Sequence, residues 1–135
     1  MANQEHLDIL KQGTETWNQW RKEHTHIQPD LKDADLIGNY LPGANFSGAD
    51  LSFADLSEAH LGGANFSNAL LTETVLSGAY LNNANLSGAS LRRAYLNRAY
   101  LSGANLSEAD LSEANLARAT LVETDLDTIP IVVYW

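Results

Sequence analysis

The sequence predicts an all-β solenoid, a chain that coils around an apolar core, and three observations support this fold class. From Leu31 to Leu126 every fifth residue is Leu or Phe, which gives twenty apolar centres in succession. Alanine stands two residues before most of these centres, and serine often follows them directly. An α-helix requires a period of 3.6 residues and a flat strand a period of two. The strict period of five instead fits a coil in which each unit forms one short side and one corner.

The repeated unit resembles that of a known family. Units such as the Ala-Asn-Phe-Ser-Gly of residues 44–48 are similar to those of pentapeptide-repeat proteins, and the resemblance covers residues 29–128. It implies a right-handed quadrilateral parallel β-helix of about five coils, each of about 20 residues. Such a solenoid is a single repeat domain, which 135 residues are long enough to build.

The residue two positions after each centre predicts how the corners turn. Glycine or asparagine is frequent there, as at Gly48, and both tolerate the positive φ that a type II turn requires. Bulkier residues occupy the same position elsewhere, and for them we expect a different turn. These are Phe53, Glu58, Arg93 and Arg98.

A coil of 20 residues would place residues 20 apart in columns, spaced by the distance between neighbouring strands. Phe46 and Phe66 would then stack on each other inside the coil. One outer column would hold amides, and we expect it to form a ladder that stabilises the stacked strands. Its members are Asn45, Asn65, Asn85 and Asn105, followed by Asp125.

The next face would carry a column of aromatic rings. Tyrosine is enriched at the energetic centres of protein interfaces, so this column is the candidate partner surface. Tyr95 would lie on the adjacent face and extend it. The alternative interpretation is a ladder of rings that only stabilises the stacking of coils. The column consists of Tyr40, His60, Tyr80 and Tyr100.

Charge adds a second feature to this surface. Residues 29–128 contain thirteen Asp or Glu and five Lys or Arg, a net charge of −8. Arg92, Arg93 and Arg98 form a basic group within this acidic field, and we include them in the candidate surface. With a net charge of −9 for the whole chain, direct binding of nucleic acid is not expected, because phosphates require a basic footprint.

Three function classes follow from these features. The leading hypothesis is a non-enzymatic interaction or scaffold module that binds an unknown protein partner. The family resemblance implies an alternative, because some acidic members imitate duplex DNA and bind a type II topoisomerase such as gyrase. Arg92, Arg93, Arg98 and Arg118 would interrupt such an imitation. The third class is a structural rod without a dedicated partner.

Nothing in the sequence predicts an enzyme, a cofactor or a metal site. There is no glycine-rich phosphate loop and no motif of an activated nucleophile. His24 and His26 lack a third ligand nearby in the sequence, and two histidines suffice for few metal sites. Asp30 and Asp50 would stack one coil apart, but the outside of a β-helix offers no cleft for catalysis.

The sequence also predicts where the protein resides. It has no cysteine, which suits a reducing compartment. The first residues show neither the basic nor the apolar region of a signal peptide, and no apolar run approaches the ~20 residues of a membrane span. We therefore expect a cytoplasmic, soluble protein without membrane contact.

Residues 1–28 are predicted to form a helical cap over the first coil. Asn3 and Thr14 can cap two successive helices, and Pro29 would end the helical segment. The segment from His6 to Arg21 also resembles the leader of cyanobacterial pentapeptide-repeat proteins. An apolar stripe at helical spacing would cover the exposed ends of the core. It consists of Leu7, Leu10, Trp17 and Trp20.

Residues 129–135 form a predicted C-terminal capping segment. Ile131 continues the five-residue phase, but the segment lacks the Ala, Ser and Gly of the repeat. It is expected to fold across the last coil and leave a monomer. The alternative is a dimer, in which the segment joins a second subunit through a two-fold contact.

Overall fold

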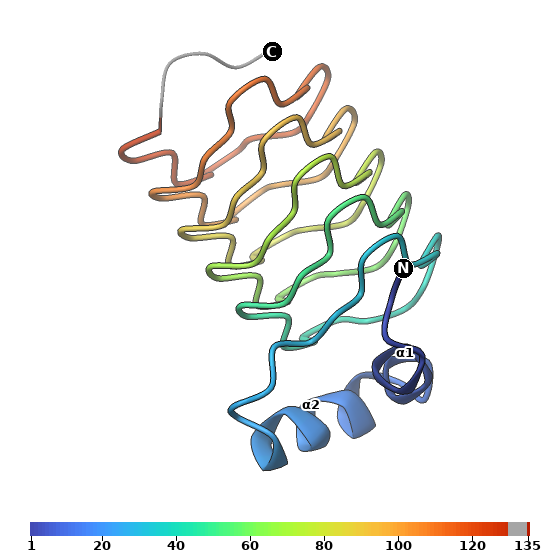
Figure 1. Cartoon of the computed structure of the whole chain (residues 1–135). Helices are drawn as coiled ribbons and strands as arrows, with labels where there is room; N and C mark the ends of the chain where they lie inside the picture. The colour runs from blue at the N-terminus through green and yellow to red at the C-terminus, as the bar shows by residue number, and fades with distance from the viewer. Residues whose placement is uncertain (130–134) are drawn as a thin grey trace.

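A computed structural model describes residues 1–129 and 135 of the protein. Two short helices, α1 (Gln4–Leu10) and α2 (Thr14–Glu23), precede a stack of coils that continues to the end of the described chain (Figure 1). Within this described part no helix is long and apolar enough to cross a membrane. The predicted C-terminal capping segment falls almost entirely outside the described residues.

The coils are joined by parallel bridges between residues 20 positions apart. Asn45 pairs with Asn65, which pairs in turn with Asn85, and the same spacing relates every other bridge in the stack. Backbone hydrogen bonds run in both directions between coils. The Leu31 N–H donates to the Asp50 carbonyl at 2.8 Å, and the Asp50 N–H donates to the Pro29 carbonyl at 2.9 Å. The predicted coil length of 20 residues is therefore confirmed.

The Leu and Phe centres point inward and fill the coil. From Leu31 to Leu111 these side chains are almost completely buried, together with the alanines two positions before them. Phe46 and Phe66 stack with ring centroids 5.0 Å apart, as the column arrangement predicts. Burying each Leu or Phe side chain contributes about 1.5–3 kcal/mol, so the ladder of centres dominates the stability of the coil.

The corners all adopt one conformation, and the expectation of a different turn at bulky residues is wrong. Phe53, Glu58, Arg93 and Arg98 have φ between 57° and 64°, close to the 68° of Gly48. At most corners the N–H three residues after a centre donates to the carbonyl of that centre, as from Ala94 to Leu91 at 3.0 Å. The burial of the centres and the bonds between coils impose this turn, and the cost of positive φ is absorbed.

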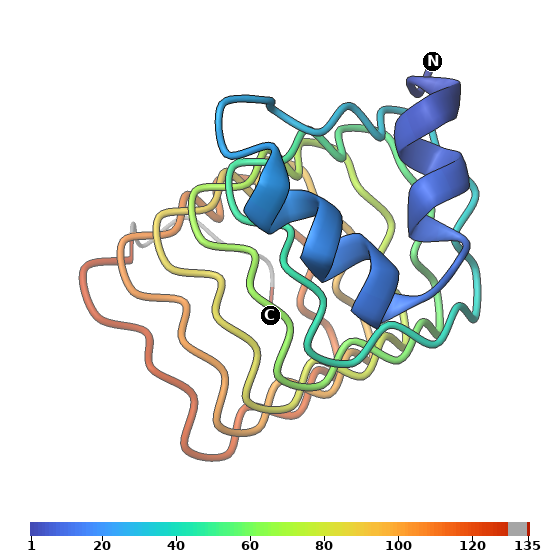
Figure 2. The ribbon, with the colours of Figure 1, turned by 90° about the horizontal axis from the view of Figure 1, so that it is seen from below.

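The two helices lie across the open end of the first coil (Figure 2). Asn3 caps α1 as predicted, since its Oδ1 accepts from the His6 N–H at 3.2 Å. Thr14 does not cap α2. The N-cap is Gly13, Thr14 is the first helical residue, and its buried hydroxyl makes no hydrogen bond within the described chain. The positive φ of 108° at Gly13 explains the shift, because glycine adopts it without strain.

The predicted apolar stripe covers the first coil. Leu10 and Trp17 are fully buried, Trp20 is 9% exposed, and Leu7 packs against the core as a partly buried residue. The ring centroid of Trp17 lies 5.8 Å from that of Phe46, the first phenylalanine of the core. The cap therefore extends the apolar core past the first coil, at the N-terminal end of the stack.

Candidate interaction surface

Four aromatic side chains form a continuous column on one outer face. The ring centroids of Tyr40 and His60 are 5.6 Å apart, and their planes are tilted by 51°. Those of His60 and Tyr80 are 4.7 Å apart at 16°, and those of Tyr80 and Tyr100 are 4.9 Å apart at 3°. Parallel bridges hold the backbone of each residue against the next. The structure thus brings together all four rings that the sequence placed in this column, and we call them the aromatic column.

The aromatic column remains accessible despite its stacking. Tyr40 is 74% exposed, whereas Tyr80 and Tyr100, which are covered by neighbours in the column, are 39% and 42% exposed. Tyr95 is 46% exposed on the adjacent side, where it pairs with Val75 and Asn115 rather than with the column. The surface therefore consists of ordered rings that remain partly accessible.

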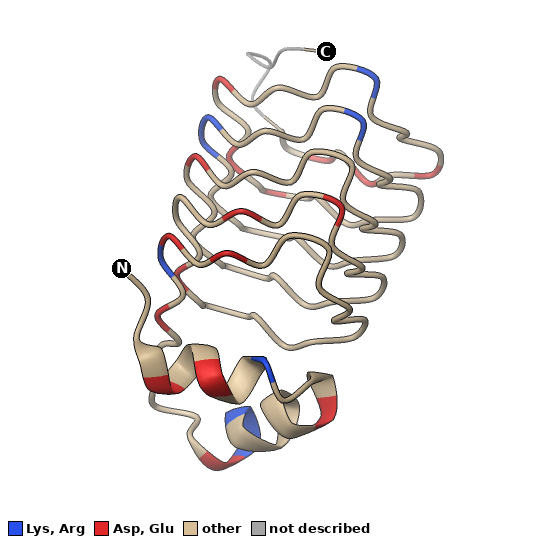
Figure 3. Cartoon of the chain, turned by 90° about the vertical axis from the view of Figure 1, so that its right-hand side faces the viewer, with Lys and Arg blue, Asp and Glu red and all other residues tan. Residues whose placement is uncertain are grey.

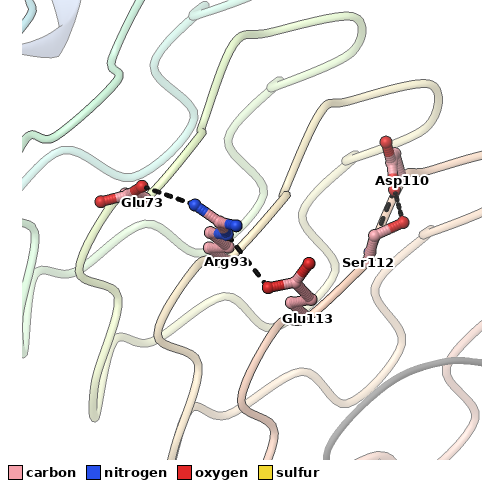
Figure 4. Close-up of polar contacts among 5 residues, drawn as sticks. All are labelled: Glu73, Arg93, Asp110, Ser112 and Glu113. Carbon is pink, nitrogen blue, oxygen red and sulfur yellow. Dashed lines mark hydrogen bonds and ion pairs between the residues drawn. The ribbon is translucent and has the colours of Figure 1, made fainter.

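The arginines fall into two groups that the sequence did not separate. Arg93 lies between two acidic residues of its own column, with nitrogen–oxygen distances of 3.7 Å to Glu73 and 3.0 Å to Glu113 (Figure 4). The hydrogen bond from Arg93 to Glu113 and the charges of both glutamates raise the arginine pKa. All three side chains are exposed, so this triad contributes little to stability.

Arg92 lies near an acidic residue as well. The pKa of Asp110 is lowered mainly by the hydrogen bond from the Ser112 hydroxyl, with smaller contributions from the Ser112 N–H and the charge of Arg92. Partial burial opposes this shift. Figure 4 shows the Asp110–Ser112 contact beside the Arg93 triad. Arg92 and Arg93 thus belong to a corner where positive and negative charges alternate.

Arg98 has a different environment. In its column the preceding coil carries Gly78 and the following coil carries Arg118, and the Arg98 N–H donates to the carbonyl of Ala117 at 2.9 Å. Among the described residues neither Arg98 nor Arg118 has a carboxylate within salt-bridge distance. Figure 3 shows basic segments on two successive coils at one corner and alternating charges at another.

The amide column is present, but its predicted ladder of amides between coils is wrong. The side-chain oxygen of each asparagine accepts from the backbone N–H two residues later, at 3.0 Å for Asn45 and Ser47 and 2.9 Å for Asn65 and Ser67. At Asn45 the serine hydroxyl donates to the same oxygen at 2.7 Å. This local bond competes successfully for the amide, so the column stabilises corners within coils.

Side chains of the cap form hydrogen bonds with backbone groups of the first coil. Of the residues involved, the sequence analysis predicted a contact with this coil only for Trp17, as part of the apolar stripe. The Asn45 carbonyl accepts from Trp17 Nε1 at 2.8 Å and from Arg21 at 2.7 Å, and Arg21 also donates to the Ser47 carbonyl at 2.8 Å. Buried His6 accepts from the Asp30 N–H at 3.0 Å. Arg21 falls on the helical stripe of Trp17, which is the one sequence signal that pointed to it.

Several apolar side chains outside the aromatic column are also exposed, among them Ile37 and Phe53. Ile37 and Phe53 are 53% and 52% exposed, and both belong to corners rather than to sides of the coil. The sequence pattern indicated Phe53 only as a turn residue. Neither residue stacks on an aromatic neighbour among the described residues, so they do not form a second column.

The described residues form no cluster of three or more metal-ligating side chains. His24 Nδ1 lies 2.9 Å from the Trp20 carbonyl, which ties this ring to the end of α2. An open pocket of about 440 Å³ lies in the cap between residues of both helices, and a second of about 250 Å³ lies where the cap meets the first coil. The candidate residues of the coil surface line neither of them.

The model of the family "Pentapeptide repeats" matches the chain in eight copies, over residues 30–68, 49–88, 59–98 and 89–128. A search of curated proteins found no match. Among solved structures, the chain is similar to HetL of the cyanobacterium Nostoc sp. strain PCC 7120, with 38% identity and a TM-score of 0.74. The match covers 82% of this chain and 46% of HetL, so the chain spans less than half the length of that protein.

A second cyanobacterial protein, Rfr23 of Cyanothece 51142, is 43% identical with a TM-score of 0.50, over 71% of this chain and 63% of its own. These neighbours imply that the stack of 20-residue coils described above is a right-handed quadrilateral β-helix. The family match extends over the whole of the region with a five-residue period. The chain belongs to the pentapeptide-repeat family.

Proposed function

We propose that this protein is a non-enzymatic interaction or scaffold module, and that the aromatic column binds a protein partner. The observation that supports the proposal most strongly is the ordered exposure of Tyr80 and Tyr100. Their rings are parallel, 4.9 Å apart, and each is about two-fifths exposed. The proposal is consistent with the family, whose members are generally structural or interaction modules rather than enzymes.

The stacking lowers the cost of binding. A side chain that is flexible in the free protein loses rotamer freedom when a partner immobilises it, at about 0.5–1.5 kcal/mol for each side chain. Tyr80 is held between His60 and Tyr100 before any partner arrives. Tyrosine also offers a large apolar ring and a hydroxyl, which suits an interface at the water boundary. The aromatic column is therefore preorganised for contact.

The competing interpretation is a ladder that stabilises the coils and binds nothing. Stacked aromatic pairs contribute about 0.5–1.5 kcal/mol beyond the area they bury. Eighteen of the twenty Leu or Phe centres, however, are buried, and the burial of each contributes at least as much as one such pair. The coil does not depend on the aromatic column for its stability, which favours a role at the surface.

The proposal is tested by photo-crosslinking at the aromatic column. A benzophenone-bearing phenylalanine replaces Tyr80 in one variant and Leu70 in the control. Leu70 is 39% exposed, like Tyr80, but lies ten residues away, half a coil distant on the opposite side. Both variants are irradiated in lysate of the source organism, and the adducts are identified by mass spectrometry.

We expect one protein to be captured reproducibly from position 80 and not from position 70. Excess unlabelled wild-type protein should suppress the adduct. Equal capture from both positions, or none from position 80, would contradict the proposal. In that event the structural rod would be the better description of the protein.

A further inference from the structure

We propose that the partner contacts this protein through a short acidic segment, bound at the corner formed by Arg98 and Arg118 with Tyr95 and Tyr100 on its two sides. We call these four residues the arginine corner. All four side chains are exposed. This inference rests on the proposed function and adds the chemistry of the partner.

The charge pattern of the arginine corner differs from that of the other arginine column. Arg93 is neutralised by Glu73 in the preceding coil and by Glu113 in the following coil. Arg98 and Arg118 instead occupy equivalent positions in successive coils, and the coil before Arg98 carries Gly78. Among the described residues no carboxylate pairs with either of them. Two positive charges therefore remain unneutralised on an acidic surface.

This arrangement is unfavourable in the free protein. Like charges opposite each other on neighbouring strands destabilise the pair, and successive coils here are separated by the spacing of strands, about 4.8 Å. A carboxylate placed between the guanidinium groups would remove the repulsion. It would also form charge-assisted hydrogen bonds, to which the planar donors of arginine are well suited. The geometry thus favours an anionic ligand.

The surroundings favour a short acidic peptide over a polyanion such as nucleic acid. Residues 29–128 carry a net charge of −8, which repels a long chain of phosphates. The positive patch consists of Arg98 and Arg118 only, which is too small to hold a long polyanion. Tyr95 and Tyr100, 46% and 42% exposed, lie on the sides that meet at this corner and can contact apolar side chains next to the acidic ones. A protein segment with a few carboxylates among apolar residues matches both features.

The test is selection from a displayed library of random dodecapeptides at low salt. The wild type is compared with R98Q/R118Q and with the matched control R92Q/R93Q. Each double variant removes two positive charges from exposed corners of the coil. Circular dichroism melts verify folding, and we expect R98Q/R118Q to melt no lower than the wild type because it removes a repulsive pair.

We expect the wild type and R92Q/R93Q to enrich peptides that contain Asp or Glu, and R98Q/R118Q to lose this enrichment. A selected peptide should bind R98Q/R118Q about tenfold more weakly in fluorescence anisotropy, which corresponds to about 1.4 kcal/mol. Its affinity for the wild type should fall with added salt.

Selection without acidic enrichment would overturn the inference, as would equal losses in the two double variants. Tighter binding of a single-stranded DNA oligonucleotide than of any peptide would also overturn it. If Tyr80→Ala abolishes selection while R98Q/R118Q changes nothing, this inference fails and the proposed function stands. If neither variant alters the selected peptides, both fail.

Discussion

Tyr80 and Tyr100 lie in adjacent coils with ring centroids 4.9 Å apart and planes inclined by only 3°. Their backbones form a parallel bridge, and the Tyr80 carbonyl accepts from the Leu61 N–H of the coil before, at 2.8 Å. The same register that buries the leucines therefore aligns the tyrosines outside. A repeat that is uniform in its core creates ordered surfaces wherever its variable positions carry related side chains.

Replacing Arg21 with Met should destabilise the first coil selectively. The guanidinium donates to the carbonyls of Asn45 and Ser47 at 2.7 and 2.8 Å, and its removal leaves fewer donors at this edge. We expect a loss of about 1.5–3 kcal/mol in the local free energy of opening, as for hydrogen bonds that involve charged groups. Hydrogen exchange of the Leu36 and Phe46 amides should report it.

The control for this prediction is Lys22→Met, which also removes one positive charge from α2 but from an exposed position. Coils of a repeat protein contact only their neighbours, so the amides of the last coils should keep their protection in both variants. A uniform loss across all coils, or equal effects of the two substitutions, would show that Arg21 does not anchor the cap.

Gly62 and Gly63 allow a direct test of the corner conformation. Gly63 has a φ of 68°, whereas Gly62, its neighbour, does not have positive φ, and a Cβ there would lie 3.7 Å from the Asn82 carbonyl. Gly63→Ala should lower the free energy of unfolding by about 1 kcal/mol, because alanine is strained at positive φ. Gly62→Ala should leave it unchanged or raise it by up to about 1 kcal/mol, since alanine restricts the unfolded chain. Urea denaturation measures both, and equal effects would contradict the assigned turn.

Ser112 should control the titration of Asp110. The serine hydrogen bond lowers the pKa of this carboxyl, so its stabilising effect is present above about pH 4 and is lost as the pH falls through the lowered pKa. Ser112→Ala should raise the titration midpoint of Asp110, measured by carbon-detected NMR, toward its ordinary value. Arg92→Gln should raise it less. A larger effect of Arg92→Gln would refute the assigned order of causes.

Much of the fold could be predicted because the sequence repeats without interruption. The position of every core centre follows from the period of five, and the Phe46–Phe66 stack follows from a coil of 20 residues. The aromatic column could be predicted for the same reason. These features depend on the register of the coils alone. A shift of register would expose the eighteen buried Leu or Phe centres from Leu31 to Leu116, so no other register competes.

The incorrect predictions concern local contacts and turns that the register of the coils does not determine. Asn45 can bond to a neighbouring coil or to Ser47, and the nearby donor prevails. Phe53 resists positive φ as an isolated residue, yet the bonds between coils impose it. The contacts of Arg21 with the first coil depend on how the helices lie across it, which no repeat encodes. The pairing of Arg93 with Glu73, by contrast, follows from the 20-residue coil, because the two residues are 20 positions apart.

The central claim is that the aromatic column binds a partner and does not merely support the coil. The most direct measurement compares partner capture and melting temperature for the double variant Y80A/Y100A, with Leu70→Ala as the control on the opposite side. We predict that Y80A/Y100A loses the partner that the wild type captures while its melting temperature falls only modestly, and that Leu70→Ala retains the partner. Retained capture together with a large fall in melting temperature would contradict the claim and identify the column as a stabilising ladder.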